Sequence, residues 1–307
     1  MDSTESGHKT ASEILGLMSI SVCDGVPGVM RISSGRAGPI VGVTVCSHGN
    51  EPSGLAAVDY LLNTLKLPVN LLRGEVYLVV NNLQAALESK RFVSVDMNRL
   101  PADTPTRDND PASEVRRSRE LLPIWKKFDV GLDIHSTSQD APPMIISLGP
   151  MFHAELVRGF PIEIVISNID RVQRGKPAPA FYGDSEKTKA IGIEAGQHDV
   201  EQAGKCASAC AEALLQNLGM LPGTTVQAGR FREFRVVASI ILPDESYSME
   251  GVFENLKHVE KGTLIAKGSG PDFVMPIDGC TIMHNGKPHP DDPKNEALFI
   301  TEPEKAW

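Results

Sequence analysis

The chain has few aromatic residues and no long apolar run. Aromatics make up 5% of its 307 residues, so Val, Ile, Leu and Ala must build most of the core. No stretch approaches the roughly 20 consecutive apolar residues of a membrane-spanning helix. The first residues, Met1-Asp2-Ser3-Thr4-Glu5-Ser6, lack the basic and apolar segments of a secretory signal. We therefore expect a globular protein with no membrane segment and no secretory signal.

Cysteines are scarce, scattered and odd in number: Cys23, Cys46, Cys206, Cys210 and Cys280. This pattern predicts reduced thiols in the cytoplasm and not a disulfide framework. Cys206 and Cys210 are four residues apart and could share a helix face, but no second pair completes a zinc knuckle, so we interpret them as small buried residues. Cys46 needs no chemical role, although its sulfur could be an adventitious ligand for a soft metal.

Positive charge is in the minority. The chain has 30 Lys and Arg residues against 39 Asp and Glu residues, a formal net charge of −9. Such a balance argues against nucleic acid or an anionic membrane surface as a partner. An anionic substrate would need positive charge concentrated at its binding site.

Apolar runs alternate with amphipathic segments from residue 40 to about residue 220. This alternation predicts a three-layer α/β domain with a mixed, mostly parallel sheet and right-handed crossovers. The last expected helix begins near Asp199, a plausible N-cap, and ends before Gly219. The expected strands are Ile40–Cys46, Glu75–Asn81, Val130–His135, Met144–Leu148, Ile162–Ser167 and Ala190–Glu194, and the expected helices are Ser53–Leu65, Ser113–Lys127 and Val200–Leu218.

The pattern changes after Leu221-Pro222-Gly223. Short β-like runs within 226–243 and 250–265 are followed by turn-forming clusters, with no convincing helix. We therefore predict two domains, an α/β domain of residues 1–222 and a small β-rich C-terminal domain of residues 223–307. We expect His284 and His289, near the proline-rich tail, to be solvated.

Two fragments predict a metal site. Ser47-His48-Gly49-Asn50-Glu51 and Asp133-Ile134-His135 each lie at the end of an apolar, β-branched run, which is typical of a buried parallel strand. Open α/β sheets bind ligands at the C-terminal edge of their strands. Two imidazoles and a carboxylate leave a fourth position of zinc open for hydrolytic chemistry. The alternative is two ordinary loop histidines and a glutamate at a helix N-terminus.

Residues 91–99 offer an anion clamp. Asn98 and Arg99 could hold a substrate carboxylate, because guanidinium pairs bidentately with carboxylate. Arg91 could face the scissile carbonyl and stabilise the oxyanion. The alternative is a polar loop with surface arginines.

Glu194 ends an apolar strand, as His135 does. A carboxylate there could move the proton from the attacking water to the leaving amine. The alternatives are a salt bridge or a charge at a helix N-terminus. His198 could support the site or start a solvated helix.

The motifs resemble those of the succinylglutamate desuccinylase/aspartoacylase family, which is related to the zinc carboxypeptidases. The resemblance covers roughly residues 40 to 302 and implies His48, Glu51 and His135 as zinc ligands, Arg91 as the carbonyl-polarising group, Asn98 and Arg99 as carboxylate binders, and Glu194 as general base and acid. The motifs that stand in the family's order are His48-Gly49-Asn50-Glu51, Arg91, Asp96-Met97-Asn98-Arg99, Asp133-Ile134-His135 and Gly192-Ile193-Glu194, and residues 260–266 resemble its C-terminal β domain.

The resemblance implies that the partner is a small N-acyl amino acid, similar to N-succinylglutamate or N-acetylaspartate, whose amide is hydrolysed to a carboxylate and a free amino acid. Animal aspartoacylases carry an additional arginine and tyrosine shortly before the catalytic glutamate, whereas this chain has Asp184 where the arginine is expected. Two other functions stay open, a metallocarboxypeptidase acting on peptide C-termini and a non-catalytic zinc-binding protein. The sequence does not decide the acyl group, the amino acid, or between a monomer and a homo-oligomer.

Overall fold

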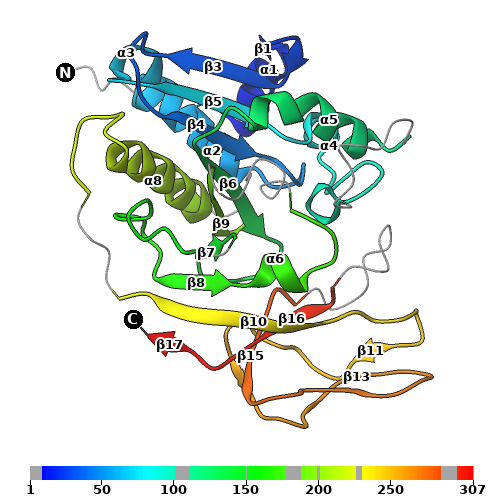
Figure 1. The fold of residues 1–307 in the computed structure, drawn as a ribbon. Helices are drawn as coiled ribbons and strands as arrows, with labels where there is room; N and C mark the ends of the chain where they lie inside the picture. Colours follow the sequence, from blue (N-terminus) through cyan, green and yellow to red (C-terminus); the bar gives the residue numbers. More distant parts are fainter. Residues whose placement is uncertain are drawn as a thin grey trace, which may run out of the picture.

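A mixed β-sheet of twelve strands runs through the described part of the chain (Figure 1). The computed structural model describes residues 9–100, 111–149, 151–177, 188–198, 201–225, 230–284 and 296–306. The strands lie in the order β12-β15-β16-β10-β8-β7-β9-β6-β4-β5-β3, with β17 pairing to β10. Their bounds are β3 Val29–Ser33, β4 Ile40–Val45, β5 Glu75–Val80, β6 Val130–Thr137, β7 Met144–Ser147, β8 Ile164–Ser167, β9 Lys189–Gln197, β10 Arg232–Ile240, β12 His258–Val259, β15 Gly279–Ile282, β16 Leu298–Thr301 and β17 Lys305–Ala306.

Two smaller sheets and a set of helices complete the described fold. The small sheets consist of β1 Val22–Cys23 with β2 Val26–Pro27, and of β11 Ser248–Met249, β13 Leu264–Lys267 and β14 Phe273–Val274. The helices are α1 Ala11–Ile20, α2 Ser53–Asp59, α3 Leu67–Asn70, α4 Leu83–Leu87, α5 Ser113–Trp125, α6 Ile169–Val172 and α8 Glu201–Asn217, with a π-helical turn η1 Tyr60–Thr64 and a 3-10 turn η2 Met97–Arg99. No helix among these residues has the length and apolar character needed to cross a membrane.

The helices cover the two faces of the sheet, so the α/β part has three layers. Val76, Leu78 and Val80 of β5 share a core with α1, α2 and α8. The alternate residues Tyr77 and Val79 belong to a second core with α5 on the opposite face. This follows from the period of two along a strand, which sends successive side chains to opposite faces.

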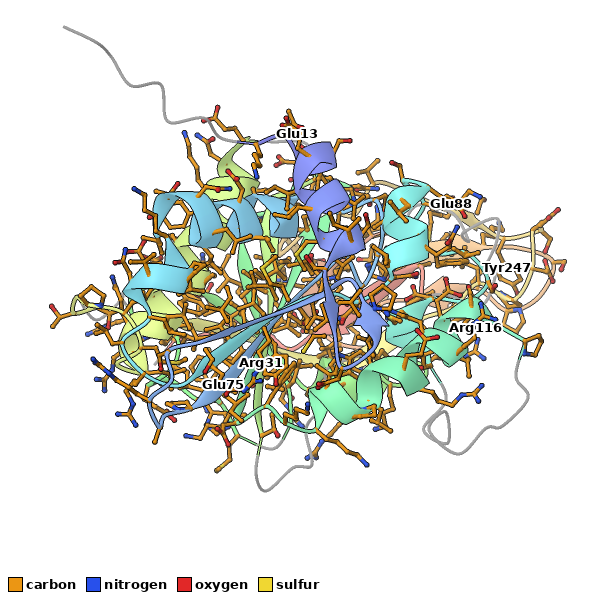
Figure 2. All side chains as sticks on the ribbon, turned by 90° about the horizontal axis from the view of Figure 1, so that it is seen from above. Glu13, Arg31, Glu75, Glu88, Arg116 and Tyr247 are labelled. Atoms are coloured by element: carbon orange, nitrogen blue, oxygen red, sulfur yellow. The ribbon has the colours of Figure 1, made fainter. Side chains whose placement is uncertain are left out.

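The predicted fold class is confirmed. The pairs β4–β5, β4–β6, β6–β9, β7–β8 and β8–β10 are parallel, and β3–β5, β7–β9 and β10–β16 are antiparallel. All six expected strands form, within about two residues of their expected ends except β9, which runs on to Gln197. At the outer edge, Arg31 of β3 donates from Nε to Oε2 of Glu75 of β5 at 2.9 Å (Figure 2).

One of the expected helices differs from its prediction in backbone geometry. The segment expected as one helix from Ser53 to Leu65 is α-helical only to Asp59, and the backbone N–H of Leu65 then donates to the carbonyl of Tyr60 in a π-type bond. Helix α8 ends before Gly219, which has φ +63, as expected for a glycine stop. The expected N-cap Asp199 lies outside the described residues.

The C-terminal strands continue the same sheet. Strand β10 pairs in parallel with β8 and in antiparallel fashion with β16, and Phe234 and Phe299 from these strands share a core with Ile146 and Ile166. No helix occurs among the described residues after Gly223, as expected. The domain boundary at 222/223 stays a prediction.

Candidate functional site

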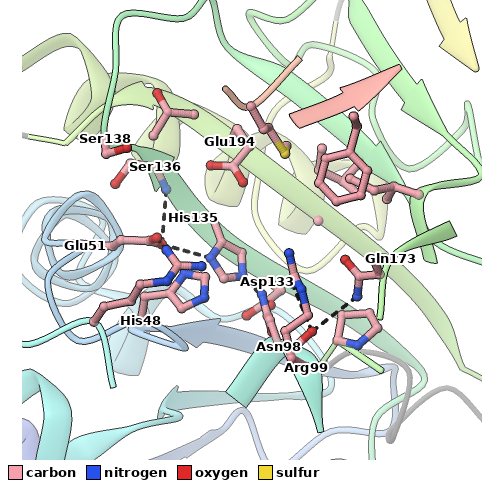
Figure 3. Close-up of a pocket in the computed structure, with 18 of the residues that line it drawn as sticks. His48, Glu51, Asn98, Arg99, Asp133, His135, Ser136, Ser138, Gln173 and Glu194 are labelled. Atoms are coloured by element: carbon pink, nitrogen blue, oxygen red, sulfur yellow. Dashed lines mark hydrogen bonds and ion pairs between the residues drawn. The ribbon is translucent and has the colours of Figure 1, made fainter. Parts of the chain in front are cut away.

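Three parallel strands deliver the candidate site residues to one edge of the sheet. His48 and Glu51 follow β4, while His135 and Glu194 lie near the C-terminal ends of β6 and β9. His135 and Glu194 are direct register partners, so Glu194 does occupy the same level of the sheet as His135. Figure 3 shows the imidazoles of His48 and His135 gathered around the Glu51 carboxylate, with Asn98 beside His135.

The turn after β4 is held in an unusual conformation. Cys46 has φ +53, a left-handed backbone conformation that residues other than glycine rarely adopt. Its buried thiol donates to the backbone carbonyl of Glu51 at 3.7 Å. A Cβ on Gly49 would lie 2.1 Å from backbone of Ala85, so only glycine fits there. These contacts fix where His48 and Glu51 point.

His48, Glu51 and His135 form a compact, buried cluster that could hold a metal ion. One ligand atom from each residue lies within 4.8 Å of the others. Nδ1 of His48 is 2.6 Å from Oε1 of Glu51, and Nδ1 of His135 is 2.8 Å from Oε2. Both imidazoles therefore turn the same nitrogen toward the carboxylate.

The other ring nitrogens meet buried carboxylates. Nε2 of His48 is 3.1 Å from Oδ1 of Asp96, and Nε2 of His135 is 2.8 Å from Oδ2 of Asp133. Asp133 also accepts a hydrogen bond of 2.6 Å from the hydroxyl of Thr44. This arrangement, in which a carboxylate orients each imidazole from behind, is usual for metal-binding histidines.

The charges within the cluster shift the pKa values of Glu51 and His135. Burial opposes ionisation of Glu51, but the charges of His48 and His135 outweigh it and lower the pKa of Glu51. Burial also opposes protonation of His135, but Asp133 and Glu51 raise its pKa well above the usual value. Glu51 and His135 thus each favour the charged form of the other.

Glu194 lies near the cluster of His48, Glu51 and His135 but is not one of its members. Among the described residues, no hydrogen-bond partner reaches its buried Oε2. Burial raises the pKa of Glu194 to about 7, with the nearby Glu51 carboxylate acting in the same direction. A carboxyl group with such a pKa can gain and lose a proton near neutral pH.

The structure brings all seven sequence-predicted site residues into one pocket. Nη2 of Arg91 donates to Oδ2 of Asp96 at 2.9 Å, and the Arg91 side chain stays 26% exposed. Nδ2 of Asn98 lies 3.1 Å from Nε2 of His135. Arg99 donates from Nε to Glu296 at 2.8 Å and from Nη1 to the carbonyl of Asn98. Both arginines are therefore held by carboxylates at the pocket.

Sequence reasoning missed the residues that hold this site together. Glu114, in the first turn of α5, accepts backbone N–H groups of Val93, Ser94 and Val95 and so anchors the loop that carries the arginines. Glu296 comes from the C-terminal part. Asp133 could have been found, since it lies two residues before His135 on a strand and thus on the same face.

Four further residues named from the sequence have different outcomes. His198 lies beside the cluster, with Nδ1 2.9 Å from the hydroxyl of Ser136, whose backbone N–H donates to Glu51. The expectation that His284 is solvated is wrong: it is 6% exposed and lines the pocket, because the C-terminal strands fold over this edge of the sheet. Asp184 and His289 lie outside the described residues.

Comparisons with known proteins agree with the fold and with the family resemblance of the sequence. The family model "Succinylglutamate desuccinylase/Aspartoacylase catalytic domain" matches residues 37–219. Similar solved structures include the succinylglutamate desuccinylase from Vibrio cholerae, with 14% identity over 89% of this chain and 84% of that chain and a TM-score of 0.70. The succinylglutamate desuccinylase from Chromobacterium violaceum has 19% identity over 96% and 97% and a TM-score of 0.66. Murine aminoacylase 3 has 21% identity over 89% and 98% and a TM-score of 0.61.

Proposed function

Because this chain belongs to the succinylglutamate desuccinylase/aspartoacylase family, whose members hydrolyse amides, we propose that it is a zinc-dependent amidohydrolase acting on N-acyl amino acids. The products would be a carboxylate and a free amino acid. The five cysteines are free thiols, which supports a cytoplasmic location.

The observation that carries the proposal is the cluster of His48, Glu51 and His135 beside Glu194, whose buried Oε2 has no hydrogen-bond partner among the described residues. Two imidazoles and one carboxylate suit zinc and leave a fourth position for water or substrate. The carboxylates behind the imidazoles support this fit, since they fix the ring orientation and increase ligand basicity. Zinc would supply a Lewis acid that polarises the amide carbonyl and makes a water more acidic.

Glu194 would carry the proton. Its carboxylate accepts a proton from the attacking water and delivers it to the nitrogen of the departing amine, so the group ends as it began. Arg91, anchored by Asp96, would donate to the carbonyl oxygen as negative charge develops there.

Asn98 and Arg99 would bind the α-carboxylate of the substrate. The contacts to Glu296 and to the Asn98 carbonyl engage Nε and Nη1 of Arg99, which fixes the guanidinium plane at the pocket. A fixed plane loses little entropy when a carboxylate binds.

A release assay tests the proposal. The zinc-loaded protein is incubated with N-succinyl, N-acetyl and N-formyl amino acids, and with peptides, and free amino acids are quantified. We expect release from N-acyl amino acids that stops after chelation. Release only from peptide C-termini would show a metallocarboxypeptidase instead. No release from any substrate by protein with one zinc per chain would favour a non-catalytic zinc-binding protein.

A further inference from the structure

His284 is a buried residue of the pocket. It follows β15, is 6% exposed, and lines the same pocket as Glu194. Neither Nδ1 nor Nε2 has a hydrogen-bond partner among the described residues. Its ring meets Phe253 nearly edge to face at 5.9 Å, a contact that packs the ring but satisfies neither nitrogen. Leaving a buried polar group unpaired is unfavourable, so such a group points to a ligand.

The backbone before His284 is strained and clamped. Met283 has φ +53, which is uncommon for a residue with a side chain. Its N–H donates to Oδ1 of Asn255 at 2.7 Å, and Nδ2 of Asn255 donates to the carbonyl of Asp140 at 3.1 Å. The fold therefore holds His284 at the pocket at a conformational cost, which argues against an accidental position.

The pocket has an apolar end next to Glu194, where the leaving amine of the proposed reaction would lie. Strand β7 pairs with β9 so that Met144 lies opposite Glu194 and Ile146 opposite Gly192, on the same face of the sheet. Ile146, Leu148, Ile169, Met283 and Phe299 line the pocket together with His284. On the other side, Gln173 of the segment after α6 donates to the carbonyl of Asn98.

This layout assigns the apolar end to the amino-acid half of the substrate. Under the proposed function, the leaving amine lies at Glu194 and the α-carboxylate at Asn98 and Arg99. The carbon that joins them then lies between these groups, and its side chain extends toward the apolar end.

The described charges at the pocket do not suit a second anion. The guanidinium groups that line it, those of Arg91 and Arg99, are each ion-paired with a carboxylate, of Asp96 and Glu296 respectively. Burial lowers the pKa of His284, so its imidazole is neutral at pH 7. A neutral imidazole offers one donor and one acceptor.

Resting on the proposed function, we propose that His284 is a specificity-determining residue that hydrogen-bonds an uncharged oxygen or nitrogen on the side chain of the substrate's amino acid. The preferred amino acid then has a side chain that is mostly apolar and uncharged, with one hydrogen-bonding group. Acidic side chains and fully apolar side chains bind less well, because one brings a desolvated charge and the other leaves His284 unpaired.

Matched substrates and variants test this assignment. N-acetylglutamine is compared with its charged analogue N-acetylglutamate and its apolar analogue N-acetylhomoleucine, and N-acetyltyrosine with N-acetylphenylalanine. The proteins are the wild type, His284→Leu, His284→Gln, which keeps a donor and an acceptor, and His258→Leu, a change at an exposed histidine of the C-terminal part. All are zinc-loaded, and kcat/KM is measured for each substrate.

We expect the wild type to prefer the uncharged polar member of at least one set by about tenfold or more, the scale of a well-formed hydrogen bond to a site built for it. His284→Leu should abolish that preference, His284→Gln should restore part of it, and His258→Leu should behave as the wild type. An unchanged preference in His284→Leu, or a wild-type preference for glutamate, would overturn the inference while leaving the proposed function intact. If no N-succinyl, N-acetyl or N-formyl amino acid is hydrolysed, the proposed function fails, and calorimetry with the free amino acids then tests His284 by binding alone.

Discussion

At the scale of single residues, the two histidines of the cluster are held in the same way, one after β4 and one on the neighbouring parallel strand β6. In each histidine, Nδ1 faces Glu51 and Nε2 contacts a buried aspartate, which is Asp96 for His48 and Asp133 for His135. The aspartates fix the ring orientation that a metal ion needs. The metal affinity of this site should therefore depend on residues that do not touch the metal.

Changing Asp133 to asparagine should weaken zinc binding by about 10- to 100-fold, the usual effect of losing such a supporting carboxylate. The measurement is zinc competition against a chelator of known affinity. Asp272→Asn, at an exposed position, serves as the control. Wild-type affinity in Asp133→Asn would show that the carboxylate does not support the ligand.

Changing Glu194 to glutamine should leave zinc bound while kcat falls by about 10²–10⁴, the span of acid–base contributions. The amide keeps the size of the side chain but cannot take a proton. Turnover and elemental analysis of the same sample make the test. Loss of zinc would instead make Glu194 a ligand and reopen the role of Glu51.

The titration of Glu194 should also be visible in stability. Its pKa is about 7 in the folded metal-free protein against an ordinary value of 4.5, so the folded state holds the proton more tightly than the unfolded state. The stabilisation from protonation is complete below pH 4.5 and is lost as pH rises to about 7. Urea unfolding of metal-free protein should therefore show Glu194→Gln gaining stability relative to the wild type across this window. A difference in unfolding free energy between the two proteins that stays constant with pH would contradict the raised pKa of Glu194.

At the scale of elements, the sequence predicts the parts of the site that depend on local pattern. Apolar runs locate the strands, and the period of two places Asp133 and His135 on one face of β6. It does not predict that β9 lies between β6 and β7, because strand order depends on long-range pairing. For the same reason, it could not show that Glu114 of α5 anchors the loop of residues 93–95.

The turn between β4 and α2 makes a separate prediction. Gly49→Ala should lose zinc and stability, since the added Cβ would lie 2.1 Å from the Ala85 backbone and push the turn that carries His48. Gly16→Ala, where no atom lies within 4 Å, should be stabilised by about 0.5–1 kcal/mol because it lies within helix α1. Melting temperatures and zinc content of both variants give the comparison. Retention of zinc by Gly49→Ala would show that the turn adapts.

At the scale of the whole molecule, the C-terminal strands extend the central sheet and reach the site. Strand β10 pairs with β8, and Glu296 binds Arg99. The change in sequence pattern at residue 223 predicts β structure but not its docking, since nothing local marks Glu296 or His284 as pocket residues. The C-terminal part thus contributes to the pocket as well as to the core.

A fragment of residues 1–222 should be insoluble or unfolded. It would leave the edge of β8 unpaired and expose the face of Ile146 and Ile166, which Phe234 and Phe299 cover in the full chain. Size-exclusion chromatography and circular dichroism are the measurements. A monomeric, folded fragment that binds zinc as the full chain does would support the division at 222/223 as two independent folding units.

In the proposed function, one metal ion at His48, Glu51 and His135 enables amide hydrolysis. The most direct measurement is a titration of zinc into chelator-stripped protein while amino-acid release from an N-acyl amino acid is followed. We expect release to rise with added zinc and to saturate at about one equivalent per chain, as for a single three-ligand site. Full activity in the stripped protein, or release that stays absent at saturating zinc, would contradict the proposed function.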